Sequence, residues 1–308
     1  MDCVRSSINP QHGRSRLRLV AALTGLLLSL SGLPAALARA DGVSPEPEPV
    51  PTSAPSSAPS SASSSAPAPV PARGSAYMGI GVRAHEPPGT APGSTPALRV
   101  NQAEGVDVAS YQGDVAWPTL WSSGVRWAYT KATEGTYYTN PYFTQQYNGP
   151  YGVGMVRGAY HFATPDTTSG TTQADYFLAH GGGWTSDGKT LPGALDIEWN
   201  PYGDACYGMS KTAMVTWIGD FLKRYKARTQ RDAVIYTATA WWSDCTGNYK
   251  GFGATNPLWI ARYASTAGTL PAGWKSYTMW QYTSSGPNVG DHDRFYDTAD
   301  KLQKFALG

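Results

Sequence analysis

The sequence predicts an α/β fold in which a parallel sheet closes into a single TIM-like barrel, and three observations predict it. From about Leu98 onward, short apolar runs alternate with helical stretches, the pattern of parallel strands joined by crossover helices. The stretch 98–308 has a length that favours one barrel over two domains. After about residue 240 the predicted helices shorten or disappear while strands continue, so the alternation is not a regular eightfold one.

The predicted strands are short runs rich in apolar, β-branched and aromatic residues. They cover Gly105–Ala109, Arg126–Lys131, Val156–Phe162, Ala194–Trp199, Ala233–Thr237, Leu258–Tyr263 and Tyr277–Tyr282. Between them, Asn140-Pro141 is typical of a helix start, with Asn as N-cap and Pro in the first position. A second helix is expected over Thr171–Ala179. The clearest helix covers Ser210–Lys226, where apolar residues recur at helical spacing behind Ser210 as N-cap.

The first forty residues have the features of a secretory signal peptide. Arg14, Arg16 and Arg18 form a basic region, residues 19–33 are apolar, and Ala38-Arg39-Ala40 offers a small-x-small cleavage site. A membrane anchor is the alternative, but the apolar run is short for a span and contains Ser and Gly. We therefore expect a signal peptide over 1–40 and a secreted, extracellular protein that has no membrane contact once the signal is removed.

Residues 41–97 are predicted to form a linker ahead of the barrel domain, which covers 98–308. Up to about Ala72 the linker consists largely of Pro, Ala, Ser and Glu, and residues 73–97 remain rich in Gly and Pro. Such a composition cannot bury enough apolar surface to offset the entropy of the ordered chain. The linker is therefore predicted to be disordered.

The charge balance argues against a nucleic-acid partner. The formal net charge is +2, but residues 1–40 hold five Arg and one Asp, which amounts to +4. The rest of the chain therefore has a net charge of −2, and it lacks the basic footprint of a nucleic-acid-binding domain.

Cysteine usage agrees with export. Cys3 lies in the signal peptide, which leaves Cys206 and Cys245 as an even pair in an oxidising compartment, so we predict a disulfide between them. Closing this loop is worth roughly 3–4 kcal/mol on the chain-entropy estimate. A metal site is the alternative, but no His stands at ligand spacing to either Cys. We expect no catalytic metal and no cofactor.

Two carboxylates, Asp196 and Glu198, stand in the apolar run Leu195–Trp199, which is typical of a buried strand. Because a strand has period two, both side chains point to the same face. Two acids on one buried face cost desolvation energy unless a function requires them. Hydrolysis of a sugar is such a function, since it uses carboxyl groups held in different protonation states. The alternative is a solvated strand edge or a structural ion pair.

Further acids and aromatic residues fall near the ends of other predicted strands, where barrels of this class gather their chemistry. Asp107 lies in the first strand, and Asp291 and Asp293 follow the last. Lys131 and Glu134 follow the second and are expected to pair near the rim. The candidates for contacting a ligand are Tyr160, Tyr236, Trp259, Trp280 and Gln281. Acids ringed by aromatic faces suit a carbohydrate, although aromatic residues in a small barrel are about as often part of the core.

Five blocks in order along the chain carry a family resemblance. They are Gly105–Gly113, Trp127–Gly135, Gly158–Phe162, Leu195–Trp199, and Trp280–Tyr282 followed by Val289–Phe295. Together they resemble the family 25 glycoside hydrolases, the Chalaropsis-type lysozymes, over essentially all of 100–308. The resemblance implies an irregular (β/α)5(β)3 barrel that hydrolyses the β-1,4 bond between N-acetylmuramic acid and N-acetylglucosamine. The expected partner is the glycan strand of bacterial peptidoglycan, and we expect the protein to act as a monomer.

The resemblance also implies roles for four acids. Glu198 is expected to be the general acid, with a pKa raised by an apolar wall and nearby carboxylates. Asp196 is a nucleophile in the ordinary retaining route and a base in the inverting one, or it orients the substrate's own 2-acetamido group. The sequence leaves these three routes open. Asp107 and Asp291 are expected to support Glu198, with Asp293 as the alternative to Asp291.

Two other functions compete with this one. A chitinase-like hydrolase of family 18 also uses Asp-x-Glu, but its signature carries more acids upstream, where this chain has Leu191 and Ala194. A non-catalytic module that binds cell-wall glycan on a flexible tether would explain the aromatic residues, but it would not explain four acids. The chain contains no Gly-x-Ser-x-Gly elbow, so a serine nucleophile is not expected.

Overall fold

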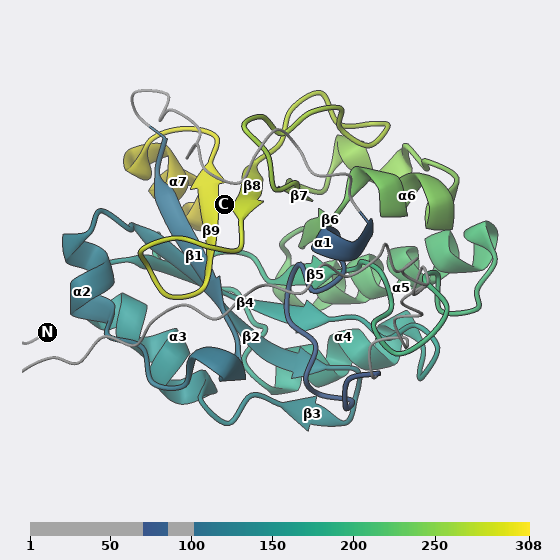
Figure 1. Cartoon of the computed structure of the whole chain (residues 1–308), viewed down its shortest axis with the longest axis horizontal. Helices are drawn as coiled ribbons and strands as arrows, with labels where there is room; N and C mark the ends of the chain where they lie inside the picture. The colour runs from purple at the N-terminus through teal and green to yellow at the C-terminus, as the bar shows by residue number, and fades with distance from the viewer. Residues whose placement is uncertain (1–69, 86–101) are drawn as a thin grey trace, which may run out of the picture. The chain divides into compact units, whose positions relative to one another are not determined.

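The computed structural model describes residues 70–85 and 102–308 (Figure 1). The predicted signal peptide and most of the predicted linker lie outside these ranges. No helix in the described ranges is both long and apolar enough to cross a membrane.

Eight strands of the described chain close into a barrel. They are β1 (Glu104–Val108), β2 (Trp127–Glu134), β4 (Val156–Phe162), β5 (Ala194–Asp196), β6 (Val234–Thr237), β7 (Leu258–Ala261), β8 (Met279–Thr283) and β9 (Asp291–Phe295). Pairing of β1 with β2 closes the ring, and β9 alone among the eight runs antiparallel to its neighbours β1 and β8. The two-residue β3 (Tyr138–Thr139) pairs with the end of β2.

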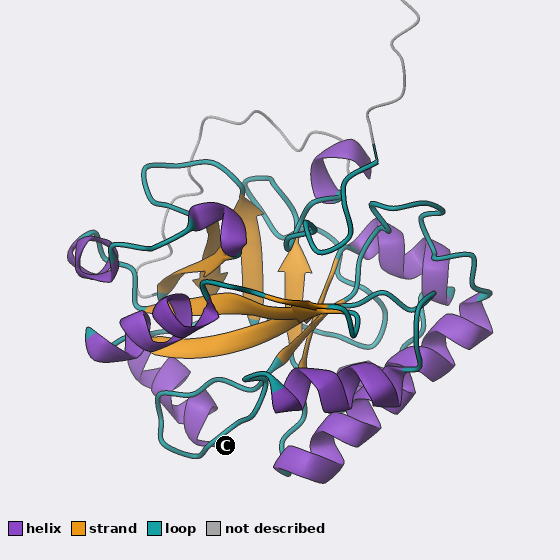
Figure 2. Cartoon of the chain, turned by 90° about the horizontal axis from the view of Figure 1, so that it is seen from below, coloured by secondary structure: helices purple, strands orange, loops and turns teal. Residues whose placement is uncertain are grey.

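Helices follow the first five barrel strands and lie outside the ring (Figure 2). They are α2 (Trp117–Ser122), α3 (Phe143–Gly152), α4 (Gly170–Ala179), α5 (Lys211–Thr229) and α6 (Thr239–Thr246), with α7 (Ala299–Leu307) after β9. Two 3-10 turns, η1 (Ser110–Gln112) and η2 (Gly251–Ala254), complete the elements of the barrel domain. Five βα units followed by three strands confirm the predicted TIM-like barrel with (β/α)5(β)3 topology.

Local chemistry accounts for the clearest helix. The side-chain oxygen of Ser210 accepts a hydrogen bond from the backbone N–H of Ala213 and so caps α5 as predicted. The α5 side chains at helical spacing are buried against the barrel and α4. The predicted helix start at Asn140 is wrong by a few residues, since α3 begins at Phe143. The side-chain oxygen of Asn140 accepts a hydrogen bond from the backbone N–H of Tyr142, and its side-chain nitrogen donates to the carbonyl of Lys131 and to Gln146.

One strand escaped prediction from the sequence. Asp291–Phe295 forms β9, although the predicted strands ended at Tyr282 and Asp291 and Asp293 were expected after the last of them. Four of its five residues are buried, yet three of those four are polar or charged, so the apolar signal on which strand prediction depends is missing. Cys206 and Cys245 are bonded as predicted and join the segment after β5 to α6, with Cα atoms 5.3 Å apart.

Large aromatic side chains fill the interior of the barrel. The ring centroids of Tyr129 and Trp259 lie 4.8 Å apart, and those of Trp127 and Trp259 lie 5.8 Å apart. Room for these rings comes from glycines, because a Cβ at Gly105 would lie 2.1 Å from the Trp127 ring and one at Gly158 would lie 2.2 Å from Tyr129. This packed layer leaves the carboxyl ends of the strands as the place for polar side chains.

Residues 70–85 are folded against the barrel, so the prediction of a disordered linker does not hold for them. They include the short helix α1 (Val82–His85), drawn in dark blue beside the labels β5 and β6 in Figure 1. Ala76, Met78 and Val82 are each at most 1% exposed.

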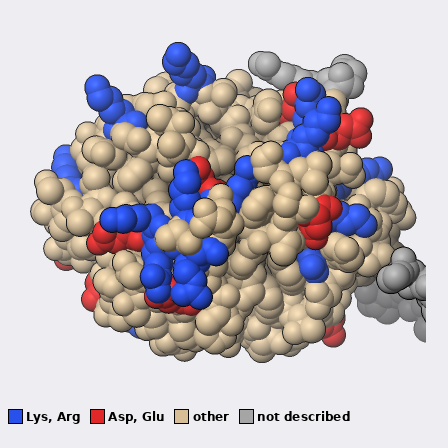
Figure 3. Space-filling model, turned by 180° about the vertical axis from the view of Figure 1, so that it is seen from behind, with Lys and Arg blue, Asp and Glu red and all other residues tan. Residues whose placement is uncertain are grey.

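The face shown in Figure 3 lies on the other side from that of Figure 1, and its Lys and Arg side chains are interspersed with Asp and Glu.

Candidate active site

Five carboxyl groups from three segments meet inside one end of the barrel. Asp107 comes from β1, Asp196 and Glu198 come from β5 and the residues just after it, and Asp291 and Asp293 come from β9. Asp107 is 4% exposed, and Asp196, Glu198 and Asp293 are fully buried. The register places Asp107 opposite Asp291, while Asp293 lies opposite Gly105, nearer the amino end of β1. The four acids predicted to be catalytic are therefore brought together.

Glu198 is held in a site that favours its protonated form. Burial, together with the negative charge of Asp291, raises the pKa of Glu198 to about 8. This rise persists although the backbone N–H groups of Gly79 and Gly81 donate to its two oxygens at 2.5 and 3.1 Å. A carboxyl group with a pKa near 8 keeps its proton at neutral pH, as a general acid must.

Asp196 lies beside Glu198 without a donor of its own. Both of its carboxyl oxygens are buried, and among the described residues no amide or hydroxyl group donates to them, although the carboxyl group of Glu198 lies within hydrogen-bond reach of Asp196. Burial raises the pKa of Asp196 well above its usual range, and the charges of Glu198 and Asp107 raise it further. Because these acids interact strongly, they titrate as a group rather than as independent residues. A buried carboxyl group without a partner is open to a donor supplied by a ligand.

Gln281, on β8, links two further acids, Asp107 and Asp291, to two tyrosines. Its side-chain nitrogen donates to Asp107 at 2.7 Å and to Asp291 at 3.3 Å. Its side-chain oxygen accepts hydrogen bonds from Tyr236 at 2.6 Å and from Tyr263 at 3.1 Å. Burial raises the pKa of Asp107 to about 7, against the lowering effect of the hydrogen bond from Gln281. Gln281 thus fixes the spacing of the acids around the mouth of the barrel.

Asp293 and Asp291 differ in depth. The indole N–H of Trp259 donates to Asp293 at 2.9 Å, inside the packed aromatic layer. Asp291 instead accepts from the hydroxyl of Tyr263 at 3.3 Å, at the level of Asp107. Asp291 therefore lies nearer the strand ends, where a ligand would bind, and Asp293 lies below it.

The predicted ligand-contacting residues divide into three groups. Tyr160 and Tyr236 are buried at the mouth beside the acids. The hydroxyl of Tyr160 accepts a hydrogen bond from the backbone N–H of Met78, in the segment ahead of the barrel. Trp259 points into the barrel but lies deep, where its role is packing. Trp280 stands on the opposite face of β8 from Gln281 and packs in a cluster with Leu258, Ile260 and Tyr282. Its predicted place beside the glycan is not supported, because the period-two alternation of β8 turns it outward.

One residue of the site was missed, and one predicted pair lies in a different place from the one expected. Tyr263 stands two residues after Ala261, in phase with Trp259, and this parity could have identified it from the sequence. Lys131 and Glu134 form an ion pair at 2.6 Å with both side chains fully buried, rather than at the rim as expected. The reason is that residues 74–76 of the segment ahead of the barrel cover the pair.

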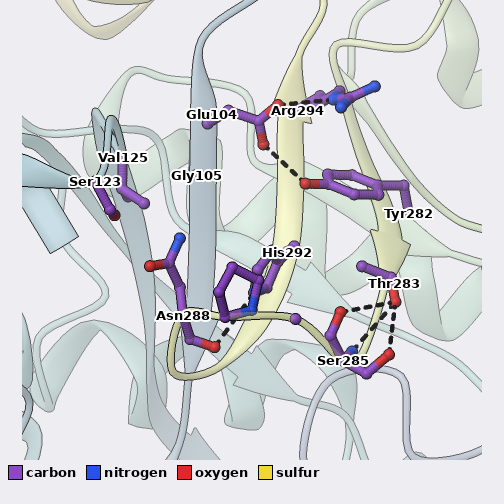
Figure 4. Close-up of a pocket in the computed structure, with 12 residues that line it drawn as sticks. Glu104, Gly105, Ser123, Val125, Tyr282, Thr283, Ser285, Asn288, His292 and Arg294 are labelled. Atoms are coloured by element: carbon purple, nitrogen blue, oxygen red, sulfur yellow. Dashed lines mark hydrogen bonds and ion pairs between the residues drawn. The ribbon is translucent and has the colours of Figure 1, made fainter. Parts of the chain in front are cut away.

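A separate pocket lies away from the acids, on the outer side of β1, β8 and β9 (Figure 4). Arg294 bonds to Glu104 there at 2.8 Å, and Tyr282 donates to the same carboxylate at 3.0 Å. The charges and hydrogen-bonding atoms of these groups are paired with one another, so the pocket has the character of a structural cluster.

Among the described residues, no group of three or more His, Cys, Asp or Glu is arranged to hold a metal ion.

Comparisons with known proteins agree with this geometry. Residues 106–291 match the sequence profile described as Glycosyl hydrolases family 25. The chain is 46% identical over 241 residues to Lysozyme M1 of Streptomyces globisporus, covering 76% of this chain and 82% of that protein. It is 48% identical over 209 residues to the N,O-diacetylmuramidase of Chalaropsis sp, covering 67% and 99%. The structure of a muramidase from Acremonium alcalophilum is similar with a TM-score of 0.66 and 50% identity, covering 67% of this chain and 99% of that one.

Proposed function

The chain belongs to glycosyl hydrolase family 25, and from this membership we propose that it is a secreted muramidase of bacterial peptidoglycan. The bond cleaved is the β-1,4 linkage from N-acetylmuramic acid to N-acetylglucosamine. The observation that carries the proposal is the buried acid group around Glu198, whose pKa is raised to about 8. The relatives named lysozyme and N,O-diacetylmuramidase support the substrate class.

In the proposed reaction, Glu198 donates its proton to the glycosidic oxygen as the bond to the sugar's anomeric carbon breaks. The carbonyl oxygen of the substrate's own 2-acetamido group attacks that carbon and forms a cyclic oxazolinium. Water then opens the ring and gives a proton to the Glu198 carboxylate, which regenerates the acid with overall retention of configuration. Substrate assistance of this kind is a known exception to the two-carboxylate scheme.

Asp196 would orient the 2-acetamido group and stabilise the positive charge that develops on it. The absence of any amide or hydroxyl donor at its oxygens among the described residues supports this role, because the N–H of the acetamido group is a suitable donor. Asp107, Asp291 and Gln281 would shape the field around Glu198 and bond the sugar hydroxyls. Tyr160 and Tyr236 would add hydroxyl groups at the same level.

The test is the release of reducing ends from purified peptidoglycan, with products identified by mass spectrometry, for the full chain and for Glu198→Gln. The matched control is Asp175→Asn, which removes a carboxylate from the surface pair with Arg224. We expect new reducing muramic acid ends, a loss of at least ~10³-fold in Glu198→Gln, and no loss in the control. New reducing glucosamine ends would move the cleaved bond and favour the chitinase-like alternative. Full activity in Glu198→Gln would refute the assignment of the acid.

A further inference from the structure

The segment ahead of the barrel occupies the space that the proposed substrate needs. Residues 73–85, called the docked segment below, run across the carboxyl ends of the strands and end in α1 (dark blue in Figure 1). We propose that this segment is an intramolecular inhibitor that closes the glycan-binding site until it is displaced. The inference rests on the proposed function of the same site and concerns its regulation.

The docked segment holds both oxygens of the proposed acid. The N–H of Gly79 donates to one oxygen of Glu198 at 2.5 Å, and the N–H of Gly81 donates to the other at 3.1 Å. A proton donor must face the glycosidic oxygen at hydrogen-bond distance. With backbone at both oxygens, no leaving-group oxygen can approach within that distance.

The same segment occupies the side chains around the acid. The N–H of Met78 donates to the hydroxyl of Tyr160 at 3.4 Å, and the side-chain nitrogen of Gln281 donates to the carbonyl of Met78 at 3.5 Å. The hydroxyl of Tyr263 approaches the carbonyl of Gly79 at 3.5 Å. Groups proposed to bond the sugar are therefore bonded to the peptide backbone instead.

A second anchor lies at the buried ion pair. Lys131 donates to the carbonyls of Gly74 and Ala76, and Glu134 accepts from the N–H of Gly74 at 2.8 Å. The hydroxyl of Tyr202 bridges the N–H of Ala76 and the carboxylate of Glu134. The segment's polar backbone groups are thus paired with barrel side chains, which is the arrangement of a bound peptide rather than of a loose tail.

Steric fit at two glycines explains how the backbone comes so close. Gly79 has φ +85°, and a Cβ there would lie 2.2 Å from the hydroxyl of Tyr263 and 2.7 Å from Gln281. A Cβ at Gly81 would lie 2.7 Å from the Cβ of Trp199.

The imidazole of His85 stacks on the ring of Trp199 with centroids 4.9 Å apart and planes 6° apart. That stacking covers an aromatic face directly beside Glu198, the kind of surface on which sugar rings pack.

The Chalaropsis N,O-diacetylmuramidase indicates that a barrel of this family can be complete without this segment, whereas the match to Lysozyme M1 covers 76% of this chain and so extends into it. The Chalaropsis N,O-diacetylmuramidase is matched over 99% of its length by 67% of this chain, so about a third of this chain has no counterpart in it. The family profile begins only at residue 106. The segment is therefore an addition to the barrel, and its covalent attachment through residues 86–101 gives it a high effective concentration at the site.

Hydrolysis of a peptide bond between His85 and Gln102 by a protease, with one water consumed, would turn the tethered segment into a dissociable peptide. The experiment places a recognition sequence for a specific protease within residues 86–101 of the full chain. The cut and uncut forms are then compared in peptidoglycan hydrolysis and in pelleting with insoluble peptidoglycan. After cutting and washing, we expect kcat/KM for peptidoglycan and the fraction of protein that pellets with insoluble peptidoglycan each to rise at least tenfold. A synthetic peptide of residues 70–85 should reverse both gains.

Point variants test the same inference in the uncut chain. Gly79→Val and Gly81→Val leave every barrel side chain in place but cannot dock without a clash, so we expect at least a tenfold rise in activity. The matched control is Ala84→Val, an exposed position on α1, which should leave activity at the level of the uncut chain. Thermal unfolding confirms that each variant is folded.

The outcomes separate this inference from the proposed function. Equal hydrolysis and equal binding by cut, uncut and glycine-variant proteins would overturn inhibition while leaving the muramidase intact. Absence of hydrolysis in all forms would refute the muramidase, and the pelleting comparison would still show whether the segment closes the site. Unfolding of the barrel after cutting would also overturn the inference, because the segment would then be a structural part of the domain.

Discussion

The buried pair of Lys131 and Glu134 provides the sharpest test of the structural reasoning. Their charged atoms lie 2.6 Å apart with both side chains fully buried. The chain offers a matched control in Lys226 and Asp232, which lie 2.8 Å apart with side chains 52% and 29% exposed. Changing each lysine to methionine removes the same charge at nearly the same distance and keeps most of the aliphatic stem. The two sites differ chiefly in burial, and Lys131 also donates to the carbonyls of Gly74 and Ala76.

The expected free-energy changes follow from burial. Removing one partner of a buried pair leaves an uncompensated charge and costs roughly 3–5 kcal/mol. Glu134 retains hydrogen bonds from Gly74, Tyr137 and Tyr202, so Lys131→Met should fall at the lower end, about 3 kcal/mol. At the exposed site solvent screens the charges, and Lys226→Met should cost about 0–1 kcal/mol.

The measurement is urea unfolding at neutral pH for both single variants and for Lys131→Met combined with Glu134→Gln. We expect the midpoint to fall by ~1 M or more in Lys131→Met and to change little in Lys226→Met. The double variant should recover more than half of the loss, since it removes the unpaired carboxylate. Equal losses for the two lysines, or a double variant as unstable as Lys131→Met, would refute the argument from buried charge.

Three further predictions concern titration, the disulfide and strand parity. Because the pKa of Glu198 is raised from 4.5 to about 8, kcat/KM should fall as pH rises through about 8. The free energy of unfolding should also fall between about pH 5 and 8, because the folded chain keeps a proton that the unfolded chain releases. A pH-independent profile of both quantities would contradict this prediction. Replacing Cys206 and Cys245 by serine should lower the free energy of unfolding by roughly 3–4 kcal/mol, as judged by chemical denaturation under non-reducing conditions, with a change below 1 kcal/mol counting against it. Trp280→Phe should lower stability with little effect on kcat/KM, whereas Gln281→Leu, on the opposite face of the same strand, should reduce kcat/KM at least tenfold; the reverse pattern would show that β8 faces the other way.

Much of the fold follows from patterns that are local in the chain. Apolar runs of strand length, the Ser210 cap and the apolar spacing behind it are decided by residues a few positions apart, and most predicted strands and helices lie close to the observed ones. The common orientation of Asp196 and Glu198 follows from period two alone. Five ordered blocks along the chain were enough to indicate the family and hence the topology of the barrel.

Other features depend on contacts between residues far apart in sequence, and local patterns carry no record of them. The polar residues of β9 are buried because they face partners on β1 and β8, so no apolar period marks the strand. Lys131 and Glu134 are buried only because Gly74 and Ala76 lie over them. The docked segment has the Gly-rich composition of a linker, and its order comes from donors and acceptors that the barrel presents. Composition reports how much surface a segment can bury by itself, whereas a neighbouring surface determines whether that segment is held in place.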